Sequence, residues 1–201
     1  MALTAPITLR WRIHDGKLPL RQRHMRALSR LDLPDALMAW VHERLEWAMI
    51  NMLTSGSEAV LVLGIDSATE VQLSLEDIRK KPILESADLM VHGDTVTGVY
   101  SDGQPIAGDI WIEQNGVLVS CVSDVFTATS TLCRDLATTL GFEVEIGQQP
   151  FPVVQKAAGR GQAFVVSDEF GFLPISSQGK GATEAEGTIT KRMREAFEKL
   201  W

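Results

Sequence analysis

The chain has 201 residues, is 45% hydrophobic and carries a formal net charge of −7. This length allows one sizeable core or two small lobes, and the negative charge argues against a general nucleic-acid-binding protein. No apolar run approaches the roughly 20 residues that cross a bilayer, and residues 1–7 show no signal-peptide pattern. We therefore expect a cytoplasmic protein with no membrane contact.

The first part of the chain predicts a hairpin followed by a short helix. Partial alternation of apolar residues predicts a strand over residues 7–14. Asp15 and Gly16 are typical of a tight turn between paired strands, so residues 17–20 are expected to be the return strand. A short helix is expected over residues 21–30.

A longer helix is predicted to begin at Pro34 and Asp35, because Pro and Asp are favoured in the first turn of a helix. Its apolar residues recur at steps of three and four and form one buried stripe. The stripe comprises Leu37, Val41, Leu45, Ala48 and Met52. Residues 54–57 are expected to end this helix.

The middle of the chain predicts strands. Residues 59–65 are continuously apolar, as in a strand buried on both faces. Residues 70–75 alternate and should lie beside them. Two further strands are expected near residues 87–91 and 96–100.

Strands are also expected over residues 109–113 and 117–121, joined by a turn at Asn115 and Gly116. Residues 127–140 predict a helix with Thr or Ser as its cap. Gly141 is the expected end of this helix, and residues 142–146 should form a strand.

The last part of the chain predicts a short helix over residues 152–158 and two strands over residues 163–167 and 172–176. A Gly-rich link over residues 179–187 should lead to a terminal helix capped by Thr188 or Thr190. The apolar side of this helix comprises Ile189, Met193, Phe197 and Leu200. Cys121 and Cys133 make neither a disulfide framework nor a metal site and are expected to be buried thiols.

Several stretches resemble, in the right order, the class IV aminotransferases, which are the fold-type IV pyridoxal phosphate enzymes. They are IHDGKLPLRQRHMRALS (13–29), DIWIEQNGVLVS (109–120), LATTLGFEVE (136–145), QAFVVSDEFGFLPIS (162–176) and GTITKRMREAFEKLW (187–201). Within that family, the short 4-amino-4-deoxychorismate lyases are nearest in length.

The resemblance implies a fold and an assembly. It implies an α+β protein with the two-lobed fold of the class IV or D-amino acid aminotransferase type, its N-terminal lobe shortened. The lobes would span residues 1–92 and 93–201, the cofactor site would be the cleft between them, and the protein would be a homodimer.

The same resemblance suggests residues that could hold pyridoxal phosphate, although several family positions hold another residue. Lys81, with Lys80 as the alternative, is the candidate for the catalytic lysine. Asp109 is the candidate for the carboxylate that faces the cofactor ring. The family's phosphate-binding arginine falls on Ala27.

The phosphate site is expected at the start of the helix over residues 127–140. The stretch Thr127-Ala128-Thr129-Ser130 lies where the family has "G-I-T-R", so Thr129, Ser130 and the backbone there could hold an anion. However, a phosphate-binding hydroxyl of the family falls on Asp168. A carboxylate close to a phosphate is repelled by roughly 1–4 kcal/mol, depending on the local dielectric.

Three functions remain open from the sequence. The first is a divergent relative that has lost the cofactor lysine and acts as a binding or assembly protein, which could still take a small anionic ligand in the cleft. The second is an active minimal pyridoxal phosphate enzyme that uses Lys81 and Asp109. The third is a cofactor-free enzyme with Thr129, Ser130 and Asp168 at the floor of the cleft. The four histidines are scattered and predict no metal site.

Overall fold

The computed structural model describes residues 7–31, 33–67, 70–101, 103–121, 127–176 and 187–199. The chain forms two compact units, Met1–Lys80 and Lys81–Trp201. The sequence-based division after residue 92 lies further along the chain. Both units mix helices and strands, as expected for an α+β protein.

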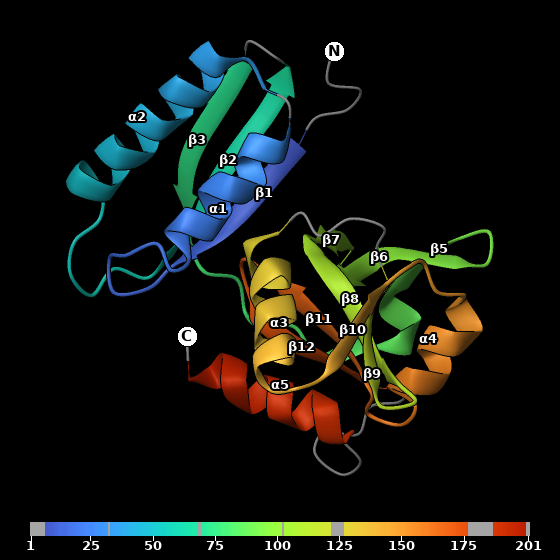
Figure 1. Cartoon of the computed structure of the whole chain (residues 1–201). Coiled ribbons are helices and arrows are strands. Elements are labelled where there is room, and N and C mark those ends of the chain that lie inside the picture. Colours follow the sequence, from blue (N-terminus) through green and yellow to red (C-terminus); the bar gives the residue numbers. More distant parts are fainter. Residues whose placement is uncertain are drawn as a thin grey trace. The chain divides into compact units, whose positions relative to one another are not determined.

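The first unit contains a three-stranded antiparallel sheet with the order β1-β2-β3 (Figure 1). Its strands are β1 (Ile7–Ile13), β2 (Ala59–Ser67) and β3 (Glu70–Glu76). The long apolar run of the sequence thus forms the central strand, with the alternating segment beside it. These predictions of strands are confirmed.

The expected hairpin in this unit is only partly correct. Asp15 and Gly16 form the turn with φ of 48° and 68°, but residues 17–20 make a single bridge, between His14 and Lys17, and no strand. The long-range pairing of β1 with β2 takes the place of the local return strand. Gly16 is required here, because a Cβ atom would lie 2.3 Å from the Thr54 carbonyl oxygen.

Two helices complete the first unit: α1 (Arg21–Leu28), continued by a 3₁₀ turn (Ser29–Leu31), and α2 (Asp35–Asn51). In Figure 1 both lie on the same face of the sheet. Val41 and Leu45 of α2 pack in one core with Trp11 and Leu63 of the strands. The prediction that Met52 belongs to the buried stripe is wrong. Helix α2 ends one residue earlier, at Asn51, and Met52 is 45% exposed.

The second unit is built on a six-stranded mixed sheet with the order β10-β9-β8-β11-β12-β4. Its strands are β4 (Leu84–Glu85), β8 (Gly108–Gln114), β9 (Val117–Ser120), β10 (Glu143–Ile146), β11 (Ala163–Ser167) and β12 (Gly171–Ser176). The outer pairs, β10 with β9 and β12 with β4, are parallel, and the other pairs are antiparallel. The strands expected from residue 109 onward are confirmed.

A smaller antiparallel sheet with the order β5-β6-β7 follows a second 3₁₀ turn, η2 (Ser86–Asp88). Its strands are β5 (Leu89–His92), β6 (Thr95–Ser101) and β7 (Gln104–Ile106). The helices of the second unit are α3 (Ala128–Thr139), α4 (Phe151–Ala158) and α5 (Thr188–Glu198). All three lie where the sequence predicts a helix.

Alternation along β8 divides the packing of the large sheet between its two faces. Ile110 and Ile112 belong to a core that also contains Val154 and Ala157 of α4. On the other face, the rings of Phe172 in β12 and Phe197 in α5 lie 5.9 Å apart, and α3 contacts both β8 and α5. The sheet is thus covered by α4 on one face and by α3 and α5 on the other (Figure 1).

The cap of α5 differs from the prediction. Neither Thr188 nor Thr190 caps the helix, which starts after Gly187 without a side-chain cap of its own. Instead Glu113 of β8 accepts hydrogen bonds from the backbone N–H groups of Ile189 (2.9 Å) and Thr190 (3.2 Å). A carboxylate distant in sequence therefore satisfies two of the free N–H groups at the start of α5.

Among the described residues, no helix is long and apolar enough to span a membrane. The predicted link over residues 179–187 lies outside the described residues, apart from Gly187, and so does Leu200.

Candidate functional site

The candidate site lies at the start of helix α3, where the sequence predicts an anion site. Thr127 precedes the helix in an extended conformation, and its hydroxyl accepts a hydrogen bond from the Ser130 N–H at 3.0 Å. The next backbone N–H groups point out of the helix end, where the helix dipole favours negative charge. We call the N–H groups of Ala128 and Thr129, together with the Thr129 hydroxyl, the α3 cup.

The α3 cup is filled by Asp168, which lies in the turn between β11 and β12. One carboxylate oxygen, Oδ1, accepts from the Thr129 N–H and the Thr129 hydroxyl, both at 2.8 Å. The other, Oδ2, accepts from the Ala128 N–H at 3.3 Å. Asp168 is only 6% exposed, and Thr129 is fully buried. A carboxylate of the chain itself thus lies where an external anion was expected.

Asp109 lies beside the α3 cup, near the start of β8. Its Oδ2 accepts from the Thr127 hydroxyl at 2.9 Å and from the Ser130 hydroxyl. Burial raises the pKa of Asp109 above its ordinary value of 3.8, and the negative charge of Asp168 raises it further, while the hydrogen bonds from Ser130 and Thr127 act in the opposite direction. Asp109 therefore takes up a proton more readily than an exposed aspartate.

The structure brings four of the five predicted site residues together. Asp109, Thr129, Ser130 and Asp168 form one hydrogen-bonded cluster. Lys81 lies in the segment between β3 and β4, which has no regular secondary structure, and its side chain is exposed, as is that of Lys80. The role of Lys81 as a catalytic lysine stays a prediction.

One residue of the site, Thr127, was not singled out from the sequence as a binding residue. Thr127 links both carboxylates, because its hydroxyl donates to Asp109 and lies 3.3 Å from the Thr129 hydroxyl. Its position as a helix cap was the signal for it.

The two cysteines are not nucleophiles in this site. Both are buried and free. Burial raises the pKa of the Cys121 thiol to about 12. Burial, together with the charge of Asp109, raises the pKa of Cys133 as well. Since the thiolate is the reactive form, both thiols stay protonated and unreactive near neutral pH, as expected for buried thiols.

The raised pKa of Asp109 predicts how stability changes with pH. Folding strengthens proton binding at this carboxyl, so its contribution to stability is fully present below pH 3.8 and is lost as the pH rises through the raised pKa. The variant Asp109→Asn cannot ionise. We expect it to be at least as stable as the native protein at pH 7, with the difference falling toward acidic pH by about 1.4 kcal/mol for each unit of the pKa shift.

Urea unfolding of both proteins between pH 4 and pH 8 measures this difference. Because all other groups titrate in both proteins, the difference isolates Asp109. A native protein that gains stability over the variant as the pH rises would contradict the assignment.

Comparison with known proteins agrees with the fold. No family model and no curated protein sequence matches this chain. The 4-amino-4-deoxychorismate lyase of Pseudomonas aeruginosa superposes with a TM-score of 0.69 at 13% identity, over 97% of this chain and 90% of the lyase. The branched-chain amino acid aminotransferase of Escherichia coli gives 0.62 at 15% identity, over 98% and 84%.

An aminotransferase from Brucella abortus, bound to the cofactor pyridoxal phosphate, gives a TM-score of 0.62 at 14% identity, over 96% of this chain and 88% of that one. The chain has the class IV aminotransferase fold. The fold that the resemblance implies is thereby confirmed. At sequence identities of 13–15% these superpositions show only the fold of the chain. They do not show its activity.

The α3 cup does not fit the phosphate of pyridoxal phosphate. Asp168 already accepts three hydrogen bonds there, and Asp109 holds the Thr127 and Ser130 hydroxyls that surround the cup. A phosphate would have to displace a buried carboxylate and would then lie close to two acids.

Proposed function

We propose that this chain is a divergent protein of the class IV aminotransferase and aminodeoxychorismate lyase fold that no longer uses pyridoxal phosphate and acts as a binding or assembly protein. The observation that carries the proposal is the Asp168 carboxylate in the α3 cup. The Asp168 carboxylate accepts the hydrogen bonds of the α3 cup, so these donors at the start of α3 are satisfied without the phosphate of a cofactor.

The energetics support this assignment. A phosphate that enters the α3 cup must break the hydrogen bonds of Asp168 with Ala128 and Thr129. Two unit charges at about 4 Å interact with roughly 1–4 kcal/mol in water or near a protein surface, and a phosphate dianion near Asp168 and Asp109 meets such repulsion more than once. Both the broken hydrogen bonds and the charge repulsion disfavour binding of the phosphate. The phosphate is a main anchor of pyridoxal phosphate.

The two other functions have weaker support. An active pyridoxal phosphate lyase or aminotransferase is favoured by the likeness to a cofactor-bound aminotransferase, and it would need Lys81 as its lysine. The third function is a cofactor-free enzyme whose active site has Thr129, Ser130 and Asp168 at its floor. It is disfavoured because Thr129 and Ser130 are fully buried. Hydroxyls with no exposed surface cannot contact a substrate without a rearrangement.

Two further parts of the proposal come from the resemblance and from composition. We expect a homodimer, so sedimentation of the full chain should give twice the mass of the monomer. We also expect a cytoplasmic location. Neither part depends on the occupancy of the α3 cup.

Incubation with pyridoxal phosphate tests the proposal directly. We expect the native protein to show no absorbance band near the visible edge, and no mass adduct on Lys81 after borohydride reduction. A variant Lys81→Met should behave identically. A yellow native protein that becomes colourless on reduction, with the adduct on Lys81 and no colour in the variant, would establish the active enzyme instead.

A further inference from the structure

A second, independent feature of the second unit is a cavity of about 340 Å³ between α4 and the turn that joins β8 to β9. Its size falls at the lower end of the range for small-molecule sites. Its walls are formed by Ile112, Glu113, Gln114, Asn115, Gly116, Val153, Lys156, Ala157, Arg160 and Gln162. It lies on the α4 side of the large sheet, whereas α3 and α5 cover the other face.

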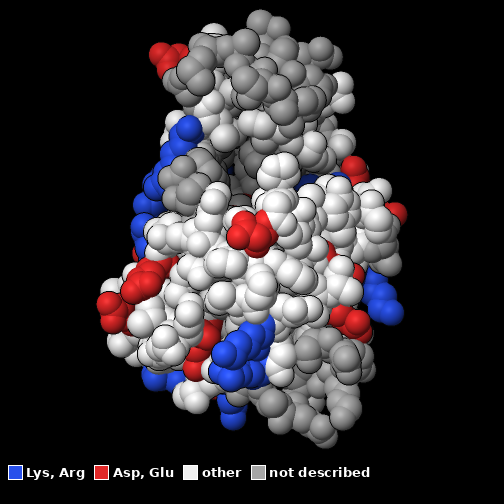
Figure 2. All heavy atoms as spheres, turned by 90° about the vertical axis from the view of Figure 1, so that its right-hand side faces the viewer, with Lys and Arg blue, Asp and Glu red and all other residues white. Residues whose placement is uncertain are grey.

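Two cations line this cavity. Lys156 lies in the last turn of α4 and Arg160 follows four residues later, just after the helix ends. Both side chains are exposed, and no ion pair within the described part of the chain involves either of them. Figure 2 views the molecule from the side on which α4 lies in Figure 1, and it shows a compact group of Lys and Arg side chains with Asp and Glu side chains close by.

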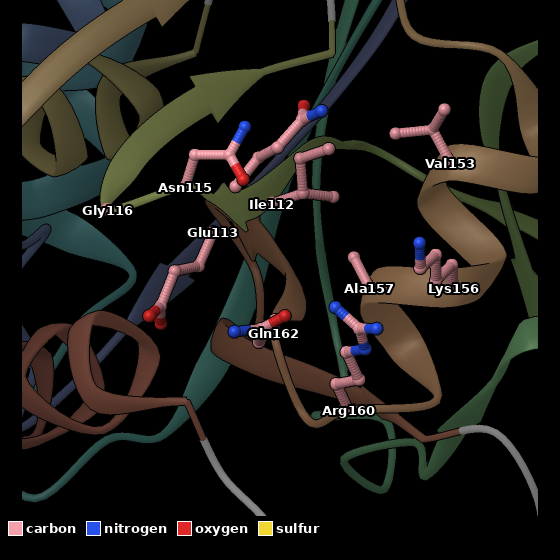
Figure 3. A pocket seen from close by; sticks show the side chains of 10 residues that line it. Ile112, Glu113, Asn115, Gly116, Val153, Lys156, Ala157, Arg160 and Gln162 are labelled. Atoms are coloured by element: carbon pink, nitrogen blue, oxygen red, sulfur yellow. The ribbon is translucent and has the colours of Figure 1, made fainter.

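The acid in the cavity wall is already engaged. Glu113 accepts from the Ile189 and Thr190 N–H groups at the start of α5, and from the Thr190 hydroxyl at 3.4 Å. Figure 3 shows its carboxylate pointing away from Lys156 and Arg160. The positive end of α5 therefore offsets the charge of Glu113, and the two cations keep their capacity for an outside anion.

The remaining walls suit a small anionic molecule. The side chains of Asn115 and Gln162 also line the cavity, and each amide carries N–H donors. Val153 and Ala157 add an apolar surface on the α4 side. Arginine and lysine with neutral donors around them are the groups that bind carboxylate and phosphate oxygens in proteins.

We propose that this cavity is a binding site for a small oxyanion ligand, whose carboxylate or phosphate group is held by Lys156 and Arg160. The site is separate from the α3 cup, and the proposal does not depend on whether the chain binds pyridoxal phosphate. Another role for these cations is to stabilise the C-terminal end of α4 through the helix dipole. That role would affect stability but would give no ligand binding.

The test is a titration of the full ¹⁵N-labelled chain, with inorganic phosphate in one arm and succinate in the other. We expect saturable shifts of the backbone amides of Lys156, Ala157, Arg160 and Gln162 in at least one arm, and the arm that responds identifies phosphates or carboxylates as the ligand class. The variants Lys156→Gln and Arg160→Gln should each weaken the binding about tenfold or more, as expected for the loss of one charge-assisted hydrogen bond.

The matched control is Arg134→Gln, which removes the same charge from an exposed position on α3. It should leave the affinity within about twofold of the native value. The proposal is overturned if neither anion produces saturable shifts at these amides. It is equally overturned if Lys156→Gln and Arg160→Gln bind as the native chain does, or if Arg134→Gln weakens binding as much as they do.

Discussion

Replacing Asp168 with alanine is expected to lower the free energy of unfolding by about 2–4 kcal/mol. The loss of a helix cap costs about 0.5–2 kcal/mol, and buried donors left without partners cost about 1–3 kcal/mol more. The donors concerned are the Ala128 and Thr129 N–H groups and the Thr129 hydroxyl. Urea unfolding of the full chain measures the change.

Two further variants separate this effect from a general loss of charge. Asp168→Asn keeps an oxygen that can accept from the α3 cup, so its loss of stability should be smaller than that of the alanine variant. Glu195→Ala removes an exposed carboxylate from α5 and should change stability by no more than about 0.5 kcal/mol. An alanine variant at Asp168 as stable as the native protein would show that the carboxylate is not needed in the cup.

Replacing Gly108 with alanine is expected to cost about 2–3 kcal/mol, as overpacking of a close-packed interior does. A Cβ atom at this position would lie 2.6 Å from the Val166 carbonyl oxygen and 2.8 Å from Cγ1 of Val165. Real Cβ atoms do not approach so closely, so β8 would have to move away from β11. That movement would carry Asp109 away from the Thr127 and Ser130 hydroxyls.

The matched control is Gly147→Ala, because nothing lies within 4 Å of a Cβ atom at that glycine. We expect it to be within about 0.5 kcal/mol of the native stability. Thermal and urea unfolding of both variants give the comparison. Equal stabilities of Gly108→Ala and Gly147→Ala would mean that the close approach of β8 to β11 is not rigid.

The elements of the fold could be predicted from local patterns wherever these agree with the tertiary structure. The apolar run that became β2 and the stripe of Val41, Leu45 and Ala48 in α2 are examples. The errors arose where a distant segment replaced a local partner. β1 pairs with β2 and not with residues 17–20, and Glu113 takes over the capping of α5 from Thr188 and Thr190.

The candidate site shows the same division. The resemblance predicts that Asp109, Thr129, Ser130 and Asp168 lie in one site. It also predicts that the Asp168 carboxylate repels a phosphate there. It could not indicate that the Asp168 carboxylate itself occupies the α3 cup, because residues 129 and 168 meet only through the packing of α3 against β11. Nor could it predict the cavity beside α4, which combines two segments that are distant in sequence, residues 112–116 and 153–162.

The central claim is that Asp168 fills the α3 cup and keeps other anions out of it, and the amide resonances of Ala128 and Thr129 test it most directly. These signals are followed in ¹⁵N-labelled chain as inorganic phosphate is added, and they are distinct from the amides of the α4 cavity. We predict no shift of either signal in the native protein and saturable shifts of both in Asp168→Ser, where a hydroxyl replaces the carboxylate. Saturable shifts of Ala128 and Thr129 in the native protein would contradict the claim.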